Sequence, residues 1–410
     1  MTGFTTTAIH GIRSKENPHG TLRVPTYDCV SFEYEDSKAI QQAFEGKRMA
    51  HTYSRISNPT VTHLEQTLRL LSGGIAVLAV SSGMAAISNT ILALGSAGKN
   101  IITTKHLFGN TLSLFEKTLS AWGLEVRYVS MNDMDTIDTA IDTDTCCVFL
   151  ESITNPQLEV ADCNAISVVA QKHGVPLVAD NTLMTPYLFN SRKNGVDIEI
   201  LSSTKYISGG GTTVGGIIID NGTFDWNKSA KLKEYAARYG SMTFIARLRQ
   251  EIYRNVGACL SPHNASMQSL GLETLSLRID KSCESSLEIA HFLSRHSTVQ
   301  ATHYPGLPDS ASYDIAQKQF GSQSGGILTF DLKNIDYCFK LMDSLNVIRR
   351  ATNVNDNKSL IIHPWSTIFA EYRDEEKCAM GIRPTMLRLA VGIEDIADLI
   401  KDLEQGLEQL

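Results

Sequence analysis

Lys205 is the side chain of this 410-residue chain with the clearest chemical potential. It stands in the hydroxyl-rich run 202–206, directly after a predicted strand at 197–201. A lysine that is withdrawn from water has a lowered pKa and becomes a nucleophilic amine. The simpler alternative is a surface lysine whose stem packs on apolar neighbours.

Asp180 is the second candidate, because it comes directly after the buried-type run 176–179. A carboxylate at the end of a buried strand costs free energy unless it has a partner. A protonated ring nitrogen would be such a partner. The alternative is structural: Asn181 or Thr182 caps the next helix.

Two further segments stand at the ends of predicted strands. Residues 81–84, Ser-Ser-Gly-Met, allow close approach of a ligand to the backbone, and the helix after them presents free amides to an anion such as phosphate. An ordinary helix start would look the same. Residues 151–156 place Glu151 and Asn155 at a sheet edge, although Asn-Pro also marks ordinary loops.

Together the four segments supply a reactive amine, an anion for a ring nitrogen and a phosphate cradle. That combination predicts pyridoxal 5′-phosphate as cofactor. Asp180 and Lys205 are 25 positions apart, which spans one strand–connection–strand unit, so both can reach one cofactor. The glycines at 209–211 come after the lysine and form no dinucleotide fingerprint.

The elements that must position these residues are alternating apolar runs and helical segments. This alternation predicts an α/β fold with a mixed, mostly parallel sheet covered on both faces, and ligands at the carboxyl ends of its strands. The predicted strands are 76–80, 100–104, 125–129, 146–150, 176–179, 197–201 and 214–219, with helices at 84–94, 111–122 and 165–173 between them.

Three parts of the chain differ in composition. We expect an N-terminal arm at 1–50 that contributes to a neighbouring subunit, a large cofactor-binding domain at 51–245, and a smaller α+β domain at 246–410. From about residue 230 the pattern changes, and we predict a long helical stretch at 232–269 that is broken near Pro262 and crosses the expected domain boundary. For the rest of the small domain we predict two helices, two strands and a closing helix: helices 285–295 and 337–345, strands 326–331 and 386–390, and a helix from 394.

Composition excludes several classes of protein. A net charge of −7 argues against nucleic-acid binding. No apolar run is long enough to span a membrane, and the start has no signal-peptide core. The eight cysteines form no C-x-x-C pair, so we expect buried thiols in a reducing, cytoplasmic compartment. The eleven histidines show no ligand spacing, so we expect no metal site.

From about residue 21 to its end, the chain resembles the Cys/Met-metabolism enzymes that depend on pyridoxal phosphate. These have the fold type I, aminotransferase-like architecture. The matching motifs are residues 53–60 (Tyr-Ser-Arg-Ile-Ser-Asn-Pro-Thr), 82–84, 151–156, 180–182, 202–206 and 388–394 (Arg-Leu-Ala-Val-Gly-Ile-Glu).

The resemblance implies a role for each matching residue. Lys205 would bind the cofactor covalently and later move protons, Asp180 would keep the ring nitrogen protonated, and Phe108 would stack on the ring. The remaining cofactor-binding candidates are Ser82, Gly83, Met84, Ser202 and Thr204 at the phosphate, Asn155 at the ring hydroxyl, and Tyr53 and Arg55 at the phosphate of a neighbouring subunit. The last pair implies a dimer with shared sites, usually two dimers in a tetramer. The substrate-binding candidates are Arg388, which would clamp the α-carboxylate, Asn353 and Glu151.

Within the family, segments 222–226, 258–262, 271–278 and 353–364 resemble the O-acetylhomoserine sulfhydrylase branch. This implies γ-replacement: sulfide, a thiol or a sulfur-carrier protein displaces acetate and forms homocysteine. Lys358 stands where cystathionine-handling members have Glu, which disfavours a co-substrate with a distal ammonium.

Other activities remain open on the sequence alone. They are a methionine or homocysteine γ-lyase, a cystathionine γ-synthase, and a protein that binds the cofactor without turnover. Phe108 replaces the usual Tyr, Asn110 stands where γ-lyases have Cys, and Trp365 replaces a small residue and could narrow the entrance. The activating group could be acetyl, succinyl or phosphoryl.

Overall fold

The computed structural model describes residues 3–12, 19–229 and 231–410. Its centre is a sheet of seven strands in the order β1-β7-β6-β5-β4-β2-β3. The strands are β1 (Ala76–Val80), β2 (Asn100–Thr103), β3 (Glu125–Tyr128), β4 (Thr145–Glu151), β5 (Leu177–Asp180), β6 (Ile198–Leu201) and β7 (Gly216–Asp220). β7 is antiparallel to both its neighbours, and the other pairs are parallel.

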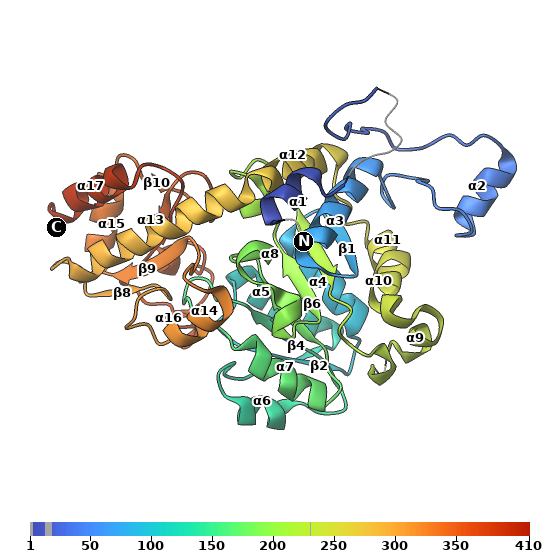
Figure 1. The fold of residues 1–410 in the computed structure, drawn as a ribbon. Helices are drawn as coiled ribbons and strands as arrows, with labels where there is room; N and C mark the ends of the chain where they lie inside the picture. The colour runs from blue at the N-terminus through green and yellow to red at the C-terminus, as the bar shows by residue number, and fades with distance from the viewer. Residues whose placement is uncertain (1–2, 13–18, 230) are drawn as a thin grey trace.

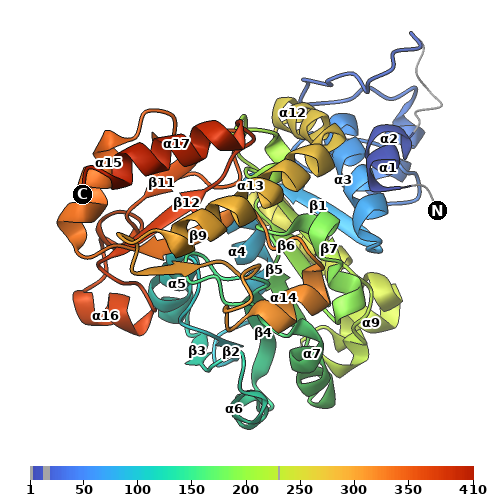
Figure 2. The ribbon, with the colours of Figure 1, turned by 60° about the vertical axis from the view of Figure 1, so that its left-hand side comes forward.

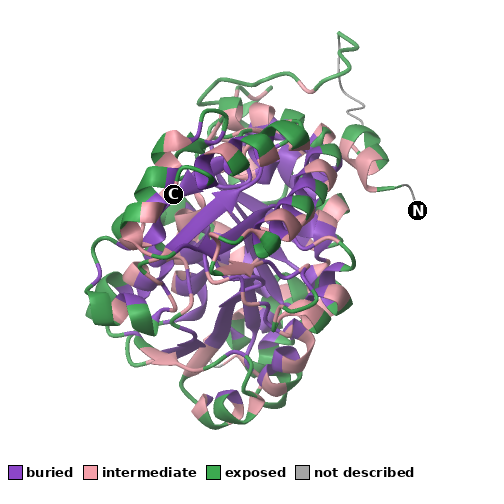
Figure 3. Ribbon diagram, turned by 90° about the vertical axis from the view of Figure 1, so that its left-hand side faces the viewer, coloured by how far each residue is buried: buried purple, intermediate pink, exposed green. Residues whose placement is uncertain are grey.

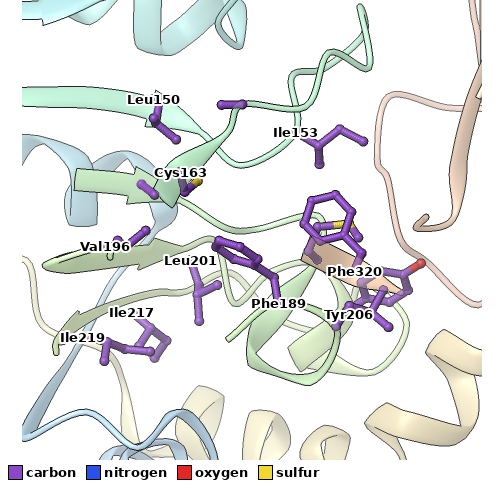
Figure 4. Packing of buried hydrophobic residues seen from close by; sticks show 14 of the residues in the cluster. Leu150, Ile153, Cys163, Phe189, Val196, Leu201, Tyr206, Ile217, Ile219 and Phe320 are labelled. Carbon is purple, nitrogen blue, oxygen red and sulfur yellow. The ribbon is translucent and has the colours of Figure 1, made fainter. Parts of the chain in front are cut away.

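This sheet confirms the predicted mixed, mostly parallel α/β architecture. The two ends of each predicted strand lie within two residues of the ends of the observed strand. Alternate side chains of the strands other than β3 enter two different cores, as in β1, where Val77 packs on one face and Leu78 on the other. Because strands such as β1 and β7 are buried on both faces, their sequences are continuous apolar runs instead of alternating ones. Figure 4 shows Leu150, Leu201 and Ile217 among the side chains of the first core. Phe189 and Phe320 belong to the same core, and their rings form an edge-to-face pair with centroids 5.6 Å apart.

Helices cover the sheet (Figure 1). Most begin at a side chain that caps them: Asn58, Ser82, Asp133 and Asp162 each accept a hydrogen bond from a first-turn amide. The helices of this part are α3 (Pro59–Ser72), α4 (Gly83–Leu94), α5 (Gly109–Ser113), α6 (Met134–Ala140), α7 (Cys163–Lys172) and α8 (Thr185–Leu188). The predicted helix 111–122 is only partly α-helical, because α5 passes into a π-helical turn at Leu114–Leu119 and a 3-10 turn at Ser120–Trp122.

The region from 232 to 295 departs most from the prediction. The long stretch is divided into α9 (Lys233–Tyr239), α10 (Thr243–Arg247), a π-helical turn (Leu248–Tyr253), α11 (Arg254–Val256) and α12 (Pro262–Glu273). Two breaks fall at Gly240 and Gly257, whose φ angles of +55° and +78° no α-helix accepts. The helix predicted at 285–295 begins ten residues earlier, as α13 (Leu275–Arg295), because Ile279 and Cys283 continue its buried stripe.

A second sheet has five strands in the order β10-β11-β12-β9-β8. Its strands are β8 (Ala301–His303), β9 (Ile327–Asp331), β10 (Arg349–Arg350), β11 (Leu360–Ile362) and β12 (Met386–Ala390). The sequence did not indicate β8, β10 or β11, which have only two or three residues each. The helices are α14 (Tyr313–Phe320), α15 (Ile335–Ser344), α16 (Asp374–Ala379) and α17 (Ile396–Leu407).

α13 connects the two parts, as Figure 2 shows. It contacts β8, β9 and α17 on one side and the 3-10 turn Tyr206–Ser208 of the large sheet on the other. The turn after the candidate lysine is therefore held directly by the helix that supports the small sheet. The predicted domain boundary near residue 246 stays a prediction.

The N-terminal segment contains α1 (Phe4–His10) and α2 (Ser37–Phe44), and the chain around α2 extends away from the body (Figure 1). Figure 3 shows an extended stretch of chain above the body that is coloured mostly as exposed. Its apolar side chains Leu22, Phe44 and Met49 are exposed. That this arm contacts a neighbouring subunit stays a prediction.

The structure bears on three expectations drawn from composition. No helix in the described part of the chain is both long and apolar enough to cross a membrane. The described residues contain no group of three or more His, Cys, Asp or Glu side chains that could bind a metal. The expectation of buried cysteines is wrong for Cys29 and Cys378, which are exposed because they lie in surface segments.

Candidate active site

A cavity of about 460 Å³ lies where the carboxyl ends of β4, β5 and β6 meet the start of α4, the start of α5 and β12 of the small sheet. Of the fourteen site residues predicted from the sequence, twelve line it: Ser82, Gly83, Met84, Phe108, Glu151, Asn155, Asp180, Ser202, Thr204, Lys205, Asn353 and Arg388. The structure therefore brings together segments separated by up to 306 positions (Ser82 to Arg388).

Lys205 lies just beyond β6 and is partly buried in this cavity. Its Nζ donates a hydrogen bond to Asn353 Oδ1 at 2.7 Å. Burial, and then the positive charge of Arg388, lower the pKa of the Lys205 amine to about 8, against a smaller opposing effect of Asp356. About a tenth of the amine is then neutral at pH 7, which is the form that attacks a carbonyl carbon.

Asp180 is the last residue of β5, and burial raises the pKa of its carboxyl group. Oδ1 accepts hydrogen bonds from the Thr182 amide at 2.9 Å and from its hydroxyl. The same hydroxyl accepts the Ser202 amide at 2.7 Å, so Thr182 joins the ends of β5 and β6. Within the described residues Asp180 has no cationic partner, although it lines the cavity.

The start of α4 forms the opposite end of the cavity. Ser82 caps the helix through a hydrogen bond from the Ala85 amide to its Oγ at 3.0 Å. Gly83 lies so close to the end of β6 that an added Cβ would be 2.7 Å from the Cβ of Ser202. The free amides of a twelve-residue helix and the hydroxyls of Ser202 and Thr204 on the same wall suit a phosphate.

We expect the substitution Gly83→Ala to weaken the binding of pyridoxal phosphate at least about tenfold, because a methyl group would displace the Ser202 side chain from the anion cradle. Equilibrium dialysis of the cofactor against the purified variant measures this. Gly3→Ala is the matched control, because nothing lies within 4 Å of an added Cβ there. Unchanged cofactor affinity in the Gly83 variant would place the phosphate elsewhere.

Arg388 lies in the middle of β12 with only 2% of its surface exposed. Its guanidinium donates to Asn155 Oδ1 at 3.1 Å and to the backbone oxygens of Thr352 and Asn353 at 3.0 and 3.3 Å. Its buried Nε has no hydrogen-bond partner among the described residues. Burial lowers the pKa of Arg388 to about 9.

Arg388 also makes no ion pair within the described ranges 3–12, 19–229 and 231–410. A buried guanidinium that has only neutral acceptors carries an uncompensated charge. An entering carboxylate would supply the missing anion with two parallel hydrogen bonds. This supports the predicted role of Arg388. It also shows that the Asn155 oxygen is used to hold Arg388, a contact that the sequence did not indicate.

Glu151 is buried beside Asp180, its partner in the register of β4 and β5. Its carboxyl accepts the backbone amides of Phe108 at 2.6 Å and Asn155 at 3.3 Å. Burial, and then the charge of Asp180, raise the pKa of Glu151 to about 8. Glu151 therefore fixes the loops that carry Phe108 and Asn155, and its direct contact with substrate stays a prediction.

The structure corrects the positions expected for two side chains. Trp365 does not line the cavity. It stacks instead against Lys377, with the ammonium 4.6 Å from the ring centroid. Lys358 does not line it either: its exposed ammonium lies 3.7 Å from Asp356 Oδ1. The predicted repulsion between Lys358 and a bound ammonium is therefore much reduced, because the side chain points into solvent beside a carboxylate.

Tyr53 and Arg55 are the two predicted residues that the structure leaves outside the cavity. Tyr53 is exposed, and Arg55 donates to the backbone oxygen of Arg254 at 2.6 Å. Their contact with the phosphate of a neighbouring subunit stays a prediction.

The cavity also contains residues that the sequence did not single out as ligand-binding, and Thr182, Thr352 and Ile368 are among them. Thr182 stood in the quoted motif, but only as a possible helix cap. Thr352 and Ile368 lie in loops of the small part, and no local pattern indicates that they face the large sheet.

The residues present fit pyridoxal phosphate. Three features face one cavity: a lysine amine with a lowered pKa, a half-buried carboxylate that has no cationic partner among the described residues, and a helix start too close-packed for any residue but glycine. Their chemistry matches the carbonyl carbon, the ring nitrogen and the phosphate of that cofactor.

Comparison with known proteins gives the same result. The family model described as "Cys/Met metabolism PLP-dependent enzyme" matches residues 5–408. The L-methionine gamma-lyase of Pseudomonas putida is 35% identical over 100% of this chain and 98% of its own. The solved structure of an O-acetylhomoserine sulfhydrylase of Wolinella succinogenes is 49% identical with a TM-score of 0.77, covering 85% of this chain and 97% of its own.

A second solved structure is that of a putative O-acetylhomoserine (thiol)-lyase of Campylobacter jejuni. It is 33% identical, with a TM-score of 0.93, over 99% of this chain and 100% of its own. It holds a pyridoxyl-lysine 5′-monophosphate at position 205.

Proposed function

Since the chain belongs to the family of Cys/Met metabolism enzymes that depend on pyridoxal phosphate, we propose that it is a transferase that forms L-homocysteine and acetate from O-acetyl-L-homoserine and a sulfur nucleophile. The observation that carries the proposal is one cavity that joins the Lys205 amine, the buried Arg388 guanidinium and the Asp180 carboxylate, which has no cationic partner in the part of the chain that the structure describes. The names of the similar structures from W. succinogenes and C. jejuni support the choice of substrate.

Each group that lines the cavity would have a separate role in binding the cofactor or the substrate. Lys205 would hold the cofactor through Nζ, Asp180 would face its ring nitrogen, and the start of α4 would hold its phosphate. When bound, the cofactor supplies an electron sink next to the substrate Cα. Arg388 would orient the substrate by its α-carboxylate, which places the Cα proton toward the Lys205 amine.

Lys205 has a pKa that suits proton transfer near neutral pH. Glu151 also has a pKa of about 8, but its carboxyl is engaged by the Phe108 and Asn155 amides. Lys205 would take protons from Cα and Cβ of the substrate. The bond between Cγ and the acetate oxygen then breaks, and acetate leaves with the electron pair. The sulfur nucleophile adds at Cγ, and Lys205 returns the protons. Phe108 has no hydroxyl that could protonate the leaving group, and acetate leaves without such help because it is a weak base.

A γ-lyase is the second candidate, favoured by the 35% identity to the L-methionine gamma-lyase of P. putida. The two activities share the steps up to loss of the γ-substituent. They differ in whether a sulfur nucleophile or water completes the reaction. Asn110, which lines the cavity where the γ-lyase branch is expected to have Cys, supports replacement over elimination.

We expect the protein with its cofactor to convert O-acetylhomoserine to homocysteine only when sulfide is added, with little 2-oxobutyrate, because Arg388 and Lys205 retain the amino acid until sulfur adds. Chromatographic measurement of both products, with and without sulfide, tests this. Protein stripped of cofactor is the control. Dominant 2-oxobutyrate in the presence of sulfide would contradict the transferase and establish a lyase.

We also propose that the protein is cytoplasmic and forms a homodimer with shared active sites, and that two such dimers form a tetramer. The proposed sulfur donor is sulfide, a thiol or a sulfur-carrier protein. The exposed apolar side chains of the arm, Leu22, Phe44 and Met49, support a partner subunit. The position of Tyr53 and Arg55 outside the cavity of their own chain supports a shared site.

A further inference from the structure

We propose that Asp356 is a positioning residue: it orients the side-chain amide of Asn353 so that the carbonyl oxygen, and not the amino group, meets the amine of Lys205. Asp356 does not line the cavity and belongs to none of the roles described above. The inference rests on the proposed role of Lys205 and is independent of which amino acid is the substrate.

Asn353 stands between the two charged groups. Its Oδ1 accepts the hydrogen bond of Lys205 Nζ at 2.7 Å, and its Nδ2 donates to Asp356 Oδ2 at 3.0 Å. A rotated amide would place its amino group against the ammonium of Lys205 and its oxygen against the carboxylate of Asp356. Both contacts would be repulsive, so the two neighbours specify the same orientation.

Asp356 is itself held by contacts in which both carboxylate oxygens accept. Oδ2 accepts from Asn353, while Oδ1 accepts the Lys358 backbone amide at 3.2 Å and lies 3.7 Å from the Lys358 ammonium. Each oxygen thus faces a donor. An asparagine at this position has one acceptor oxygen for two donors, so one contact would be lost whichever way its amide turned.

The loop that carries Asp356 packs closely on the loop after Lys205. An added Cβ at Gly211 would be 2.6 Å from Asp356 Oδ2, and one at Gly210 would be 2.7 Å from the amide nitrogen of Asn357. Asn357 in turn donates to the Gly209 backbone oxygen at 3.2 Å. The two loops are therefore held in register, which keeps Asp356 at a fixed distance from Lys205.

The charged groups around Lys205 determine the expected direction of the effect. The other ionisable side chains that line the cavity are Glu151 on β4, Asp180 at the end of β5 and Arg388 on β12. Arg388 lowers the pKa of Lys205, whereas Asp356 raises it. Loss of the Asp356 charge and of the Asn353 acceptor both destabilise the ammonium, so the pKa of Lys205 falls and its neutral fraction at pH 7 rises.

The substitution Asp356→Asn in the full-length protein tests the proposal. The cofactor is removed, pyridoxal phosphate is added back, and the rate of covalent capture is followed by visible absorbance as a function of pH. Covalent binding of the cofactor needs the neutral amine of Lys205, so the rate rises with pH and reaches half its maximum at the pKa of that amine. We expect the midpoint to move to lower pH by about half a unit, roughly a threefold change in neutral amine.

A double-mutant cycle separates positioning from a general charge effect. We expect Asp356→Asn to produce a much smaller shift in an Asn353→Ala background, where no amide remains to be oriented. Asp343→Asn, an exposed carboxylate of the same part of the chain, is the matched control and should leave the midpoint unchanged. Asp356→Glu keeps both acceptors and should lie closer to wild type than Asp356→Asn.

Two results would overturn the proposal. One is a pH profile of Asp356→Asn that superposes on wild type. The other is an equal shift in the presence and absence of the Asn353 amide, which would leave Asp356 acting by its charge alone. Neither measurement uses an amino-acid substrate, so failure of the proposed transferase reaction would not alter it.

Discussion

The substitution Lys205→Ala is expected to lower kcat/KM by at least about 10⁴-fold, because one amine supplies both the attachment of the cofactor and the proton transfers. Lys205 lines the cavity, and its pKa is lowered to about 8. Within the described part of the chain no second lysine faces the same space. Turnover of O-acetylhomoserine with sulfide measures the loss.

A second readout distinguishes chemistry from folding. After reduction with borohydride and digestion, mass spectrometry should find the cofactor on the Lys205 peptide of the wild type and on no peptide of the variant. Lys193→Ala is the matched control, because Lys193 is exposed at the far end of the connection between β5 and β6. Retention of full turnover in Lys205→Ala would contradict the proposed mechanism.

Arg388 is expected to give the second largest effect. We expect Arg388→Ala to lower kcat/KM about 100-fold, mainly through KM, because the α-carboxylate of the substrate loses its charged partner. Arg388→Lys should recover little. An ammonium is a point donor, and it cannot serve Asn155, Thr352 and a carboxylate together as the planar guanidinium does.

The control for Arg388 lies in the same small sheet. Arg349→Lys changes an exposed arginine of β10 and should leave KM unchanged. Because Arg388 is buried, thermal unfolding of each variant should be compared, together with the visible absorbance of bound cofactor. An Arg388→Ala protein that folds, binds cofactor and keeps the wild-type KM would show that the substrate carboxylate binds elsewhere.

The strands of the large sheet could be predicted well along the chain because all of them except β3 are largely buried. A continuous apolar run such as 146–150, short and followed by a predicted helix at 165–173, is typical of a buried parallel strand. The short strands of the small sheet could not be predicted in the same way. β10 has two residues and β11 three, and their pairing depends on β12, far along the chain.

The prediction for the region after residue 232 failed for a different reason. Its helical pattern is continuous, but Gly240 and Gly257 adopt positive φ angles that end α9 and α11. A glycine inside a helical pattern costs only about 1 kcal/mol, so sequence does not decide between a tolerated glycine and a break. The packing of the neighbouring helices decides it.

For the site, the sequence by itself determined the inventory of functional groups and the cofactor that they suit. Lys205, Asp180 and Gly83 each lie at the end of a recognisable strand or at the start of the helix after it, and the carboxyl ends of parallel strands meet at one edge of the sheet. Their convergence is therefore a consequence of local pattern and a general rule of topology.

Only the tertiary structure decided what each group contacts. In the folded protein Lys358 points into solvent and Trp365 contacts Lys377 outside the cavity. The Asn155 oxygen accepts a hydrogen bond from Arg388, and Asp356 accepts one from Asn353. These contacts join segments of the two sheets that are far apart in sequence. Side-chain direction and burial there depend on how the two parts pack, and no spacing along the chain records that packing.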